Sequence, residues 1–301
     1  MEALSKMLDT TIEESILEMR KLFKTNDDKR DAGLPTEVEG VKRINDLSYG
    51  PDEKWNLLDI YLPTDVEKPI PTIINIHGGG FCYGTKETYQ FFGLNWAQRG
   101  FAFINPNYKL APDAVFPDEL DQVNQYIHWV ADHAEEYGLD TNNVFLMGDS
   151  AGGQMAEQYV AILTNPEYRK LFGYDLTNLH FRAAVLNSPA TFLLDSGAIN
   201  GAVKGYFTED VVKNQKEKLN VEKYITKDYL PTYICTATED FIRNNSIKLD
   251  GFLTAKGITH ICKMYGDDKN PRGHVFLVNQ KDDIAKKAND DEMAFLNKYL
   301  V

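Results

Sequence analysis

Apolar runs of strand length alternate with amphipathic stretches along most of the chain. Strand-like runs occupy residues 55–63, 72–77, 101–106, 143–148, 182–187, 231–237 and 258–264. Apolar residues at spacings of three and four predict helices at residues 86–99, 117–137, 151–164, 243–256 and 282–300. Strands that alternate with helices are typical of a mostly parallel sheet with helices on both faces. The pattern therefore predicts an α/β fold.

The first part of the chain, residues 1–40, lies outside this alternation. Apolar residues at helical spacing predict an amphipathic helix over residues 8–24, and Thr11 and Glu14 have the spacing of a capping box. The charged, glycine-containing residues 25–40 predict a surface loop. We expect this N-terminal helical extension to pack against the core, and a part in a lid over the functional site is the alternative.

Residues 190–229 also interrupt the alternation, because they form a stretch without clear strand signal. Such a stretch is too long for a plain connection. Its aromatic residues, together with a charged helical patch at 209–218, predict an inserted lid with an apolar underside, and a surface excursion is the alternative. Nothing marks a linker, so residues 1–301 are expected to form a single domain.

The segment Gly148–Gly153 lies between a predicted strand and a predicted helix. A sharp strand-to-helix turn needs close backbone approach, which accounts for glycine at Gly148 and Gly152. The segment has the G-x-S-x-G pattern of a nucleophile elbow, with Ser150 at its centre. The pattern alone is weak, since an ordinary tight turn has the same composition.

A second glycine cluster, His77–Phe81, follows the predicted strand at 72–77. Ligands of open α/β sheets bind beyond the carboxyl ends of the strands, where both glycine segments lie. Acyl transfer places negative charge on a carbonyl oxygen, and fixed N–H donors stabilise that charge. We therefore predict an oxyanion hole formed by the backbone N–H groups of Gly79, Gly80 and Ala151.

A serine hydroxyl needs a nearby base to become a nucleophile, so Ser150 predicts a histidine later in the chain. Two of the six histidines follow the predicted lid. His260 lies within an alternating strand, where a structural histidine is usual, whereas His274 lies in a loop rich in turn residues. His274 is therefore the predicted base.

The base needs an acid to orient it, and the expected chain order is serine, acid, histidine. Asp240 follows the predicted strand at 231–237 and is the predicted acid, with Glu239 as the neighbour that could replace it. Other carboxylates within reach along the sequence are Asp250 on a predicted helix and Asp267 and Asp268 in a solvated turn.

Composition limits the classes of partner that the protein is expected to bind. A net charge of −13 argues against nucleic acid. No apolar run approaches the roughly 20 residues that span a bilayer, and the first residues resemble no signal peptide, so a cytoplasmic protein without a membrane span is predicted. Cys82, Cys235 and Cys262 show no CxxC spacing and are predicted to be buried thiols, not disulfides or metal ligands. Copies of the chain could associate into a homo-oligomer, but no segment locates such a surface.

The chain resembles the hormone-sensitive-lipase-like branch of the α/β-hydrolase superfamily, above all its small bacterial carboxylesterases and acetyl esterases. The resemblance rests on His77–Phe81 with Gly84, Asn107–Pro112, Gly148–Gly153, Ser188–Pro189, Asp240 and His274. It implies an α/β-hydrolase fold with a small lid, a triad of Ser150, Asp240 and His274, and a loop-shaping role for His77. Departures from the common pattern occur at Lys109, Asp113 and Phe241–Arg243.

The expected function is hydrolysis of a small-molecule ester in two steps through an acyl-enzyme, without a metal or organic cofactor. Short acyl chains are expected because aromatic residues crowd the oxyanion loop in the sequence: Phe81, Tyr83, Phe91, Phe92 and Trp96. The alternatives are deacetylation of acylated carbohydrates and, from a different class, a non-catalytic ligand-binding protein of the same fold.

Overall fold

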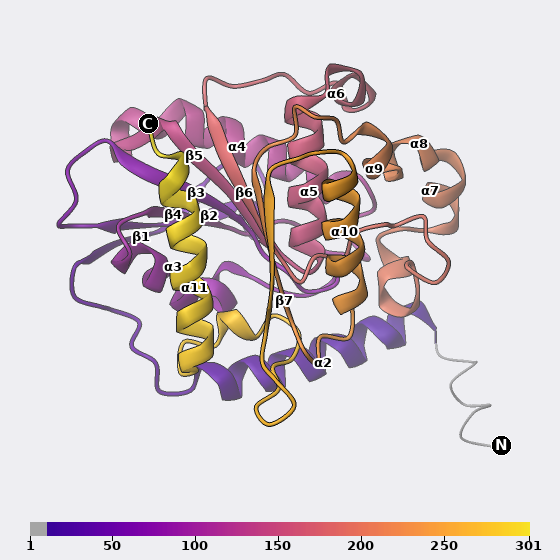
Figure 1. Cartoon of the computed structure of the whole chain (residues 1–301), viewed down its shortest axis with the longest axis horizontal. Helices are drawn as coiled ribbons and strands as arrows, with labels where there is room; N and C mark the ends of the chain where they lie inside the picture. The colour runs from indigo at the N-terminus through magenta and orange to yellow at the C-terminus, as the bar shows by residue number, and fades with distance from the viewer. Residues whose placement is uncertain (1–10) are drawn as a thin grey trace.

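A single sheet of eight strands runs through the computed structural model of the protein, which describes residues 11–301 (Figure 1). The strands are β1 (Val41–Ser48), β2 (Leu57–Pro63), β3 (Ile70–Ile76), β4 (Ala102–Pro106), β5 (Leu139–Asp149), β6 (Phe181–Asn187), β7 (Thr232–Ala237) and β8 (His260–Tyr265). Their order across the sheet is β1-β2-β4-β3-β5-β6-β7-β8. β2 is antiparallel to both of its neighbours, and the six strands from β4 to β8 are parallel.

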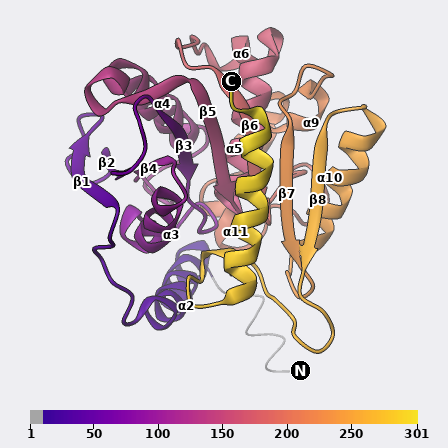
Figure 2. The same ribbon diagram turned by 60° about the vertical axis from the view of Figure 1, so that its left-hand side comes forward.

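Helices cover both faces of the sheet (Figures 1 and 2). One face carries α3 (Lys86–Gln98) and α11 (Asp283–Leu296). The other carries α4 (Asp118–Tyr137), α5 (Ala151–Thr164) and α10 (Arg243–Ala255). Successive side chains of a strand point to opposite faces of the sheet. Ile73 accordingly packs in the core under α3, and Ile74 packs in the core under α5. The predicted α/β fold with a mostly parallel sheet is therefore confirmed.

The remaining helical elements are short and lie in the connections. They are α6 (Pro166–Phe172), α7 (Glu209–Asn214), α8 (Lys216–Leu219) and α9 (Val221–Tyr224), with 3-10 turns η1 (Gly201–Gly205), η2 (Phe276–Val278) and η3 (Asn297–Tyr299). Four of these elements, η1 and α7 to α9, fall within residues 190–229. Their buried side chains, among them Tyr206, Phe207 and Leu219, join the core beside α5.

The N-terminal helix differs from the prediction. Thr11 caps the helix α2 with the expected capping box. The helix runs from Ile12 to Asp31, so the predicted loop over 25–40 is wrong for residues 25–31. Charged residues continue the helix because they pair along its surface, as Lys24 does with Asp28. Residues 8–10 of the predicted helix lie outside the described residues.

Two further elements have no counterpart in the predictions. β1 is an edge strand whose residues are mostly exposed or half-buried, so its sequence lacks a clear apolar alternation. α6 begins at Pro166 directly after α5, where proline at the first helical position starts a new helix. Cys82 and Cys235 are buried as predicted, whereas Cys262 on β8 is half-buried.

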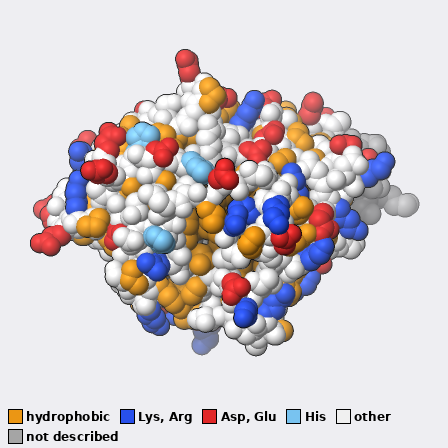
Figure 3. Space-filling view, turned by 90° about the horizontal axis from the view of Figure 1, so that it is seen from above, with side chains coloured by type: hydrophobic (Ala, Val, Ile, Leu, Met, Phe, Trp, Pro, Cys, Tyr) orange, Lys and Arg blue, Asp and Glu red, His pale blue; other side chains and the backbone are white. Residues whose placement is uncertain are grey.

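α2 lies across the carboxyl ends of the parallel strands, along the lower edge of the molecule in Figure 1. On the face opposite α2, acidic and basic side chains are interspersed (Figure 3). None of the helices between residues 11 and 301 has both the length and the apolar character to cross a membrane.

Candidate active site

Ser150 occupies the turn between β5 and α5. Its backbone has φ 52° and ψ −115°, a conformation that non-glycine residues rarely adopt. A Cβ atom at Gly148 would lie 2.3 Å from the Gly152 carbonyl oxygen, and one at Gly152 would lie 2.0 Å from the Ile76 carbonyl oxygen. Glycine is therefore required on both sides of Ser150, as the elbow pattern predicts.

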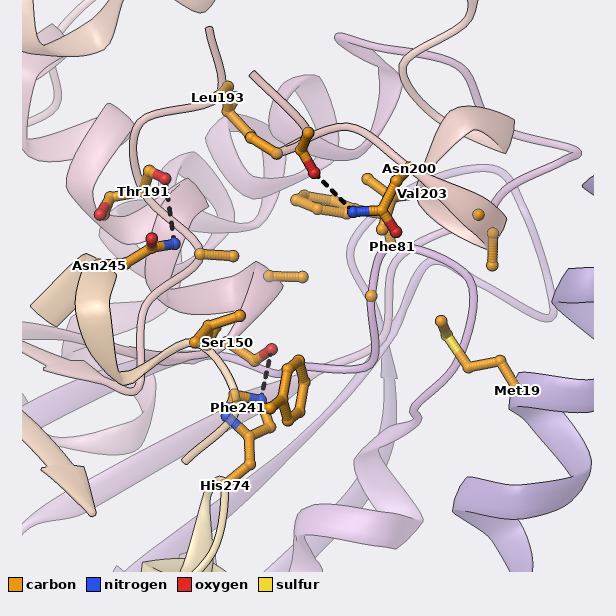
Figure 4. Close-up of a pocket in the computed structure, with 18 of the residues that line it drawn as sticks. Met19, Phe81, Ser150, Thr191, Leu193, Asn200, Val203, Phe241, Asn245 and His274 are labelled. Atoms are coloured by element: carbon orange, nitrogen blue, oxygen red, sulfur yellow. Dashed lines mark hydrogen bonds between the residues drawn. The ribbon is translucent and has the colours of Figure 1, made fainter. Parts of the chain in front are cut away.

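The structure brings Ser150, His274 and Asp240 into one hydrogen-bonded series. The Ser150 hydroxyl donates to Nε2 of His274 over 2.9 Å (Figure 4). Nδ1 of His274 donates to Oδ1 of Asp240 over 2.7 Å, since an ionised carboxylate can only accept. The three residues follow β5, β7 and β8, so parallel strands of one sheet deliver them to the same edge.

Asp240 is held from several directions. Its side chain is 0% exposed, and it accepts hydrogen bonds from the Thr236 hydroxyl at 3.0 Å and the Ile242 backbone N–H at 3.0 Å. Burial alone would raise the pKa of Asp240, but the hydrogen bond and charge of His274, together with hydrogen bonds from Ser188 and the Ile242 backbone, lower it. The carboxylate therefore stays ionised and fixes the orientation of the imidazole.

The alternative acids and base lie elsewhere. His260 is bonded to the Ile258 carbonyl at 2.8 Å and to Asp250 at 3.1 Å, a structural pair between β8 and α10. The backbone of Glu239 pairs with that of Gly273, and it is Asp240, not Glu239, that bonds to His274. Asp267 accepts backbone hydrogen bonds within its own turn.

The glycine loop after β3 lies against this series. Gly79 and Gly80 have φ of 126° and 60°, and a Cβ atom at Gly79 would lie 2.0 Å from the Tyr83 carbonyl oxygen. Among residues 11–301, no acceptor is found for the backbone N–H groups of Gly79, Gly80 or Ala151. These donors are available to a ligand beside Ser150, in keeping with the predicted oxyanion hole.

A network that the sequence did not predict ties the glycine loop to the elbow. The Gly78 N–H donates to Oδ1 of Asp149 at 3.0 Å, and the Tyr89 hydroxyl donates to Oδ2 at 2.7 Å. Burial raises the pKa of Asp149 to about 6, opposed by the hydrogen bond from Tyr89. The only sequence signal for this link is the acidic residue inside the G-x-S-x-G pattern.

His77 serves the shape of the loop. Its ring stacks on Tyr108 with centroids 4.0 Å apart, and its Nδ1 lies 2.8 Å from the Gly78 carbonyl oxygen. Burial lowers the pKa of His77 to about 4, so the ring is neutral. Ser150 and His274 make their hydrogen bond without it.

Two cavities meet at Ser150. The larger, of about 730 Å³, lies between α2 and residues 190–203, with Met19, Phe81 and Leu193 around it (Figure 4). The smaller, of about 400 Å³, lies between the second half of α2 and the glycine loop. Both are lined by Phe23, Ser150, Phe241 and His274. Residues 11–301 contain no cluster of His, Cys, Asp and Glu suited to a metal ion.

Several similar sequences are named as esterases. An esterase of Gibberella moniliformis is 38% identical over 92 residues, which cover 30% of this chain and 29% of the relative. Carboxylesterase NlhH of Mycobacterium tuberculosis is 29% identical over 129 residues, covering 42% of this chain and 40% of the relative. The chain thus matches well under two thirds of the length of these relatives.

A solved structure shares the fold over nearly the whole chain. Esterase B of Lactobacillus rhamnosis is 23% identical, has a TM-score of 0.84 and covers 96% of each chain. A further structure of that esterase, in complex with a tributyrin phosphonate, has a TM-score of 0.87 at 22% identity and covers 96% of this chain and 95% of that one.

Fold and site together define an α/β hydrolase. The family model BD-FAE matches residues 58–253, which include the glycine loop, the elbow and Asp240. The chain belongs to the BD-FAE family.

Proposed function

We propose that the protein is a serine carboxylesterase that hydrolyses short-chain acyl esters. The observation that carries the proposal is the hydrogen-bonded series from Asp240 through His274 to Ser150, next to unoccupied N–H donors. The names of the relatives support an ester hydrolase, although they are matched over less than half of their length.

The first half of the proposed reaction acylates Ser150. Nε2 of His274 takes the hydroxyl proton while Oγ attacks the ester carbonyl, and Asp240 stabilises the imidazolium that forms. The N–H groups of Gly79, Gly80 and Ala151 bind the oxyanion. The carbon–oxygen bond to the alcohol then breaks, and the alcohol leaves with the proton from His274.

The second half releases the acid. Nε2 of His274 takes a proton from water, and the hydroxide oxygen attacks the acyl carbonyl on the same oxyanion donors. The bond between the acyl carbon and Ser150 Oγ breaks, and His274 returns the proton to Oγ. All groups needed are side chains and backbone of this chain.

The aromatic residues expected to favour short acyl chains do not all lie at the site. Phe81 and Tyr83 line the cavities, but Phe92 and Trp96 are buried on the α3 face of the sheet and Phe91 lines a separate hollow. The preference for short chains therefore depends on Phe81, which stacks on Tyr206 and lines the larger cavity together with Ser150. Deacetylation of acylated carbohydrates uses the same chemistry and differs in the alcohol. The cytoplasmic location and a homo-oligomer stay predictions.

The test is a series of para-nitrophenyl esters from acetate to decanoate, hydrolysed by the wild type and by Ser150→Ala. We expect the highest kcat/KM on short chains and a loss of about 10⁴-fold or more in the variant. Rates that rise steadily toward decanoate would contradict the short-chain preference. A folded wild type that hydrolyses none of the esters would favour the non-catalytic binding protein.

A further inference from the structure

Residues 190–193, the cavity wall, form one side of the larger cavity at Ser150 (Figure 4). The backbone N–H of Ala190 donates to the Ser150 carbonyl oxygen at 3.0 Å, which ties the start of the wall to the nucleophile elbow. Leu193, at the other end of the wall, is a buried apolar residue that lines the same cavity. An ester chain that extends from Ser150 into this cavity therefore meets the wall.

Phe192 has an unusual backbone conformation within the wall. Its φ is 60°, in the left-handed region that bulky residues rarely adopt. Its ring packs edge-on against Phe252 with centroids 6.1 Å apart, and Nζ of Lys248 lies 3.8 Å from the centre of the ring. Both of these partners lie on α10. A residue stays in such a conformation only where surrounding contacts hold it, and such residues are frequent at ligand-binding sites.

Glu222 holds the backbone of Phe192. Its Oε1 accepts a hydrogen bond from the Phe192 N–H at 2.6 Å, although the two residues are 30 positions apart. Glu222 lies on α9 and is half-buried. A second contact ties the wall to α10, since Nδ2 of Asn245 donates to the Thr191 carbonyl oxygen at 3.2 Å (Figure 4). A carboxylate that accepts from a backbone N–H forms one of the stronger hydrogen bonds, so Glu222 restrains the wall at its strained residue.

Contacts on both sides of Glu222 fix α9. Val221 is 1% exposed and packs in the core beside α5. Tyr224 stacks on Tyr168 with centroids 4.3 Å apart, and its carbonyl oxygen accepts from Nδ2 of Asn165 at 2.9 Å. Glu222 therefore holds the wall from a helix that is packed on the core.

We propose that Glu222 is a positioning residue that keeps the cavity wall in place and thereby sets the chain length of ester that the larger cavity favours. This role rests on the proposed esterase function. A wall that is already ordered loses little conformational freedom when an apolar chain binds against it, so the contact lowers KM. Without Glu222, Phe192 can leave the left-handed region, and part of the binding free energy is then lost on ordering the wall again.

The test uses two series of esters, one for each portion of the ester that can extend along the wall. The acyl series compares para-nitrophenyl acetate with the hexanoate, and the alcohol series compares methyl butyrate with butyl butyrate. Glu222→Leu removes the acceptor with little change in volume. In at least one series it should lower the ratio of kcat/KM for the long ester to that for the short ester about tenfold, through KM, with kcat within about threefold. Glu222→Gln keeps an oxygen that accepts from the Phe192 N–H, and both ratios should stay within about twofold of the wild type.

Glu217→Leu is the matched control. Glu217 lies on α8, is 51% exposed and bonds to Lys223 and Tyr224 outside the larger cavity. The control should leave both ratios within about twofold. Unchanged ratios in Glu222→Leu, or equal losses in Glu222→Leu and Glu222→Gln, would overturn the role of Glu222 alone. A wild type inactive on every ester would instead remove the esterase function itself.

Hydrogen exchange of the wild type tests the contact without a variant, and it decides between the outcomes if Glu222→Leu does not fold. The amide of Phe192 should exchange slowly in a residue-resolved measurement, because a hydrogen-bonded amide exchanges only when its segment opens. Exchange of this amide at the rate of an unfolded peptide would show that Glu222 does not hold the wall and would overturn the proposal.

Discussion

The residues at the strand ends and the helix that covers them are held in very different ways. Ser150, Asp240 and His274 follow parallel strands of the sheet and bond to one another. α2 exposes much of its surface, with Leu17 63% and Leu22 57% exposed. The sheet edge therefore fixes the three bonded side chains, and α2 determines the space around them.

A few contacts attach α2 to the loops that follow the strands. Ile16 is the buried residue of the helix, and Arg20 donates to the Cys82 carbonyl at 2.7 Å and the Ala111 carbonyl at 2.8 Å. Changes at the strand ends should therefore abolish activity, while changes on the inner side of α2 should alter substrate choice.

The largest effect is expected at the strand ends. Asp240→Asn should lower kcat on para-nitrophenyl butyrate by about 10³ to 10⁴-fold, because an amide cannot hold the imidazole in the tautomer that accepts from Ser150. The control is Asp250→Asn, which alters the other aspartate–histidine pair and should stay within about threefold. Equal losses in both variants would mean that the loss reflects folding and not the orientation of His274.

A smaller effect is expected on α2. Met19 lines the larger cavity next to Gly80, so Met19→Ala should enlarge the space for the acyl group. The ratio of kcat/KM for octanoate to that for butyrate should rise about fivefold, with kcat on butyrate nearly constant. Leu17→Ala on the exposed side of the same helix should leave the ratio unchanged. A collapse of kcat in Met19→Ala would show that α2 also holds Ser150 and His274 in place and does more than shape the space around them.

The smallest effect is expected on thermal stability, at a buried glutamate of α11. Glu292 on α11 is fully buried near Asn187, whose carbonyl accepts a hydrogen bond from the Ser150 N–H. Burial raises the pKa of Glu292 to about 8. As pH rises above the ordinary glutamate range, the unfolded chain ionises while the folded protein keeps the proton. The free energy of unfolding therefore falls with pH until the folded pKa is reached.

Glu292→Gln removes this loss. Its Tm should exceed that of the wild type by roughly 2–4 °C at pH 8 and by less than about 1 °C at pH 5 in thermal unfolding scans. Asp283→Asn on the exposed side of α11 should show no such difference between the two pH values. A constant Tm difference across pH would rule out titration of Glu292 as the cause.

Local patterns predicted most of the fold and the three residues that the structure joins by hydrogen bonds, Ser150, Asp240 and His274. The elements β3 to β8 follow apolar runs, and the position of Ser150 follows from glycines that the turn requires. The sequence did not predict β1, because an exposed edge strand lacks apolar alternation. The expectation of a small pocket relied in part on Trp96, which is near the glycine loop in sequence. Proximity in sequence does not show which face of the sheet a side chain packs on, and Trp96 packs on the face covered by α3.

Sequence patterns did not predict which charged side chains lie around the site. Asp27 and Tyr83 are 56 positions apart, and their hydrogen bond exists only because α2 returns across the strand ends. The contacts of Phe241 are similar, since its ring lies 4.3 Å from that of His274 although the side chain is 75% exposed. Such contacts depend on the packing of covering segments, for which the chain carries no motif.

Covalent labelling shows whether Ser150 is the nucleophile. The protein is incubated with a para-nitrophenyl alkylphosphonate, and residual esterase activity is compared with the site and stoichiometry of the adduct by peptide mass spectrometry. We expect one adduct per chain on Ser150, with activity lost in proportion to labelling and no adduct in Ser150→Ala. Full activity in protein labelled at Ser150, or inactivation with the adduct on another residue, would contradict it.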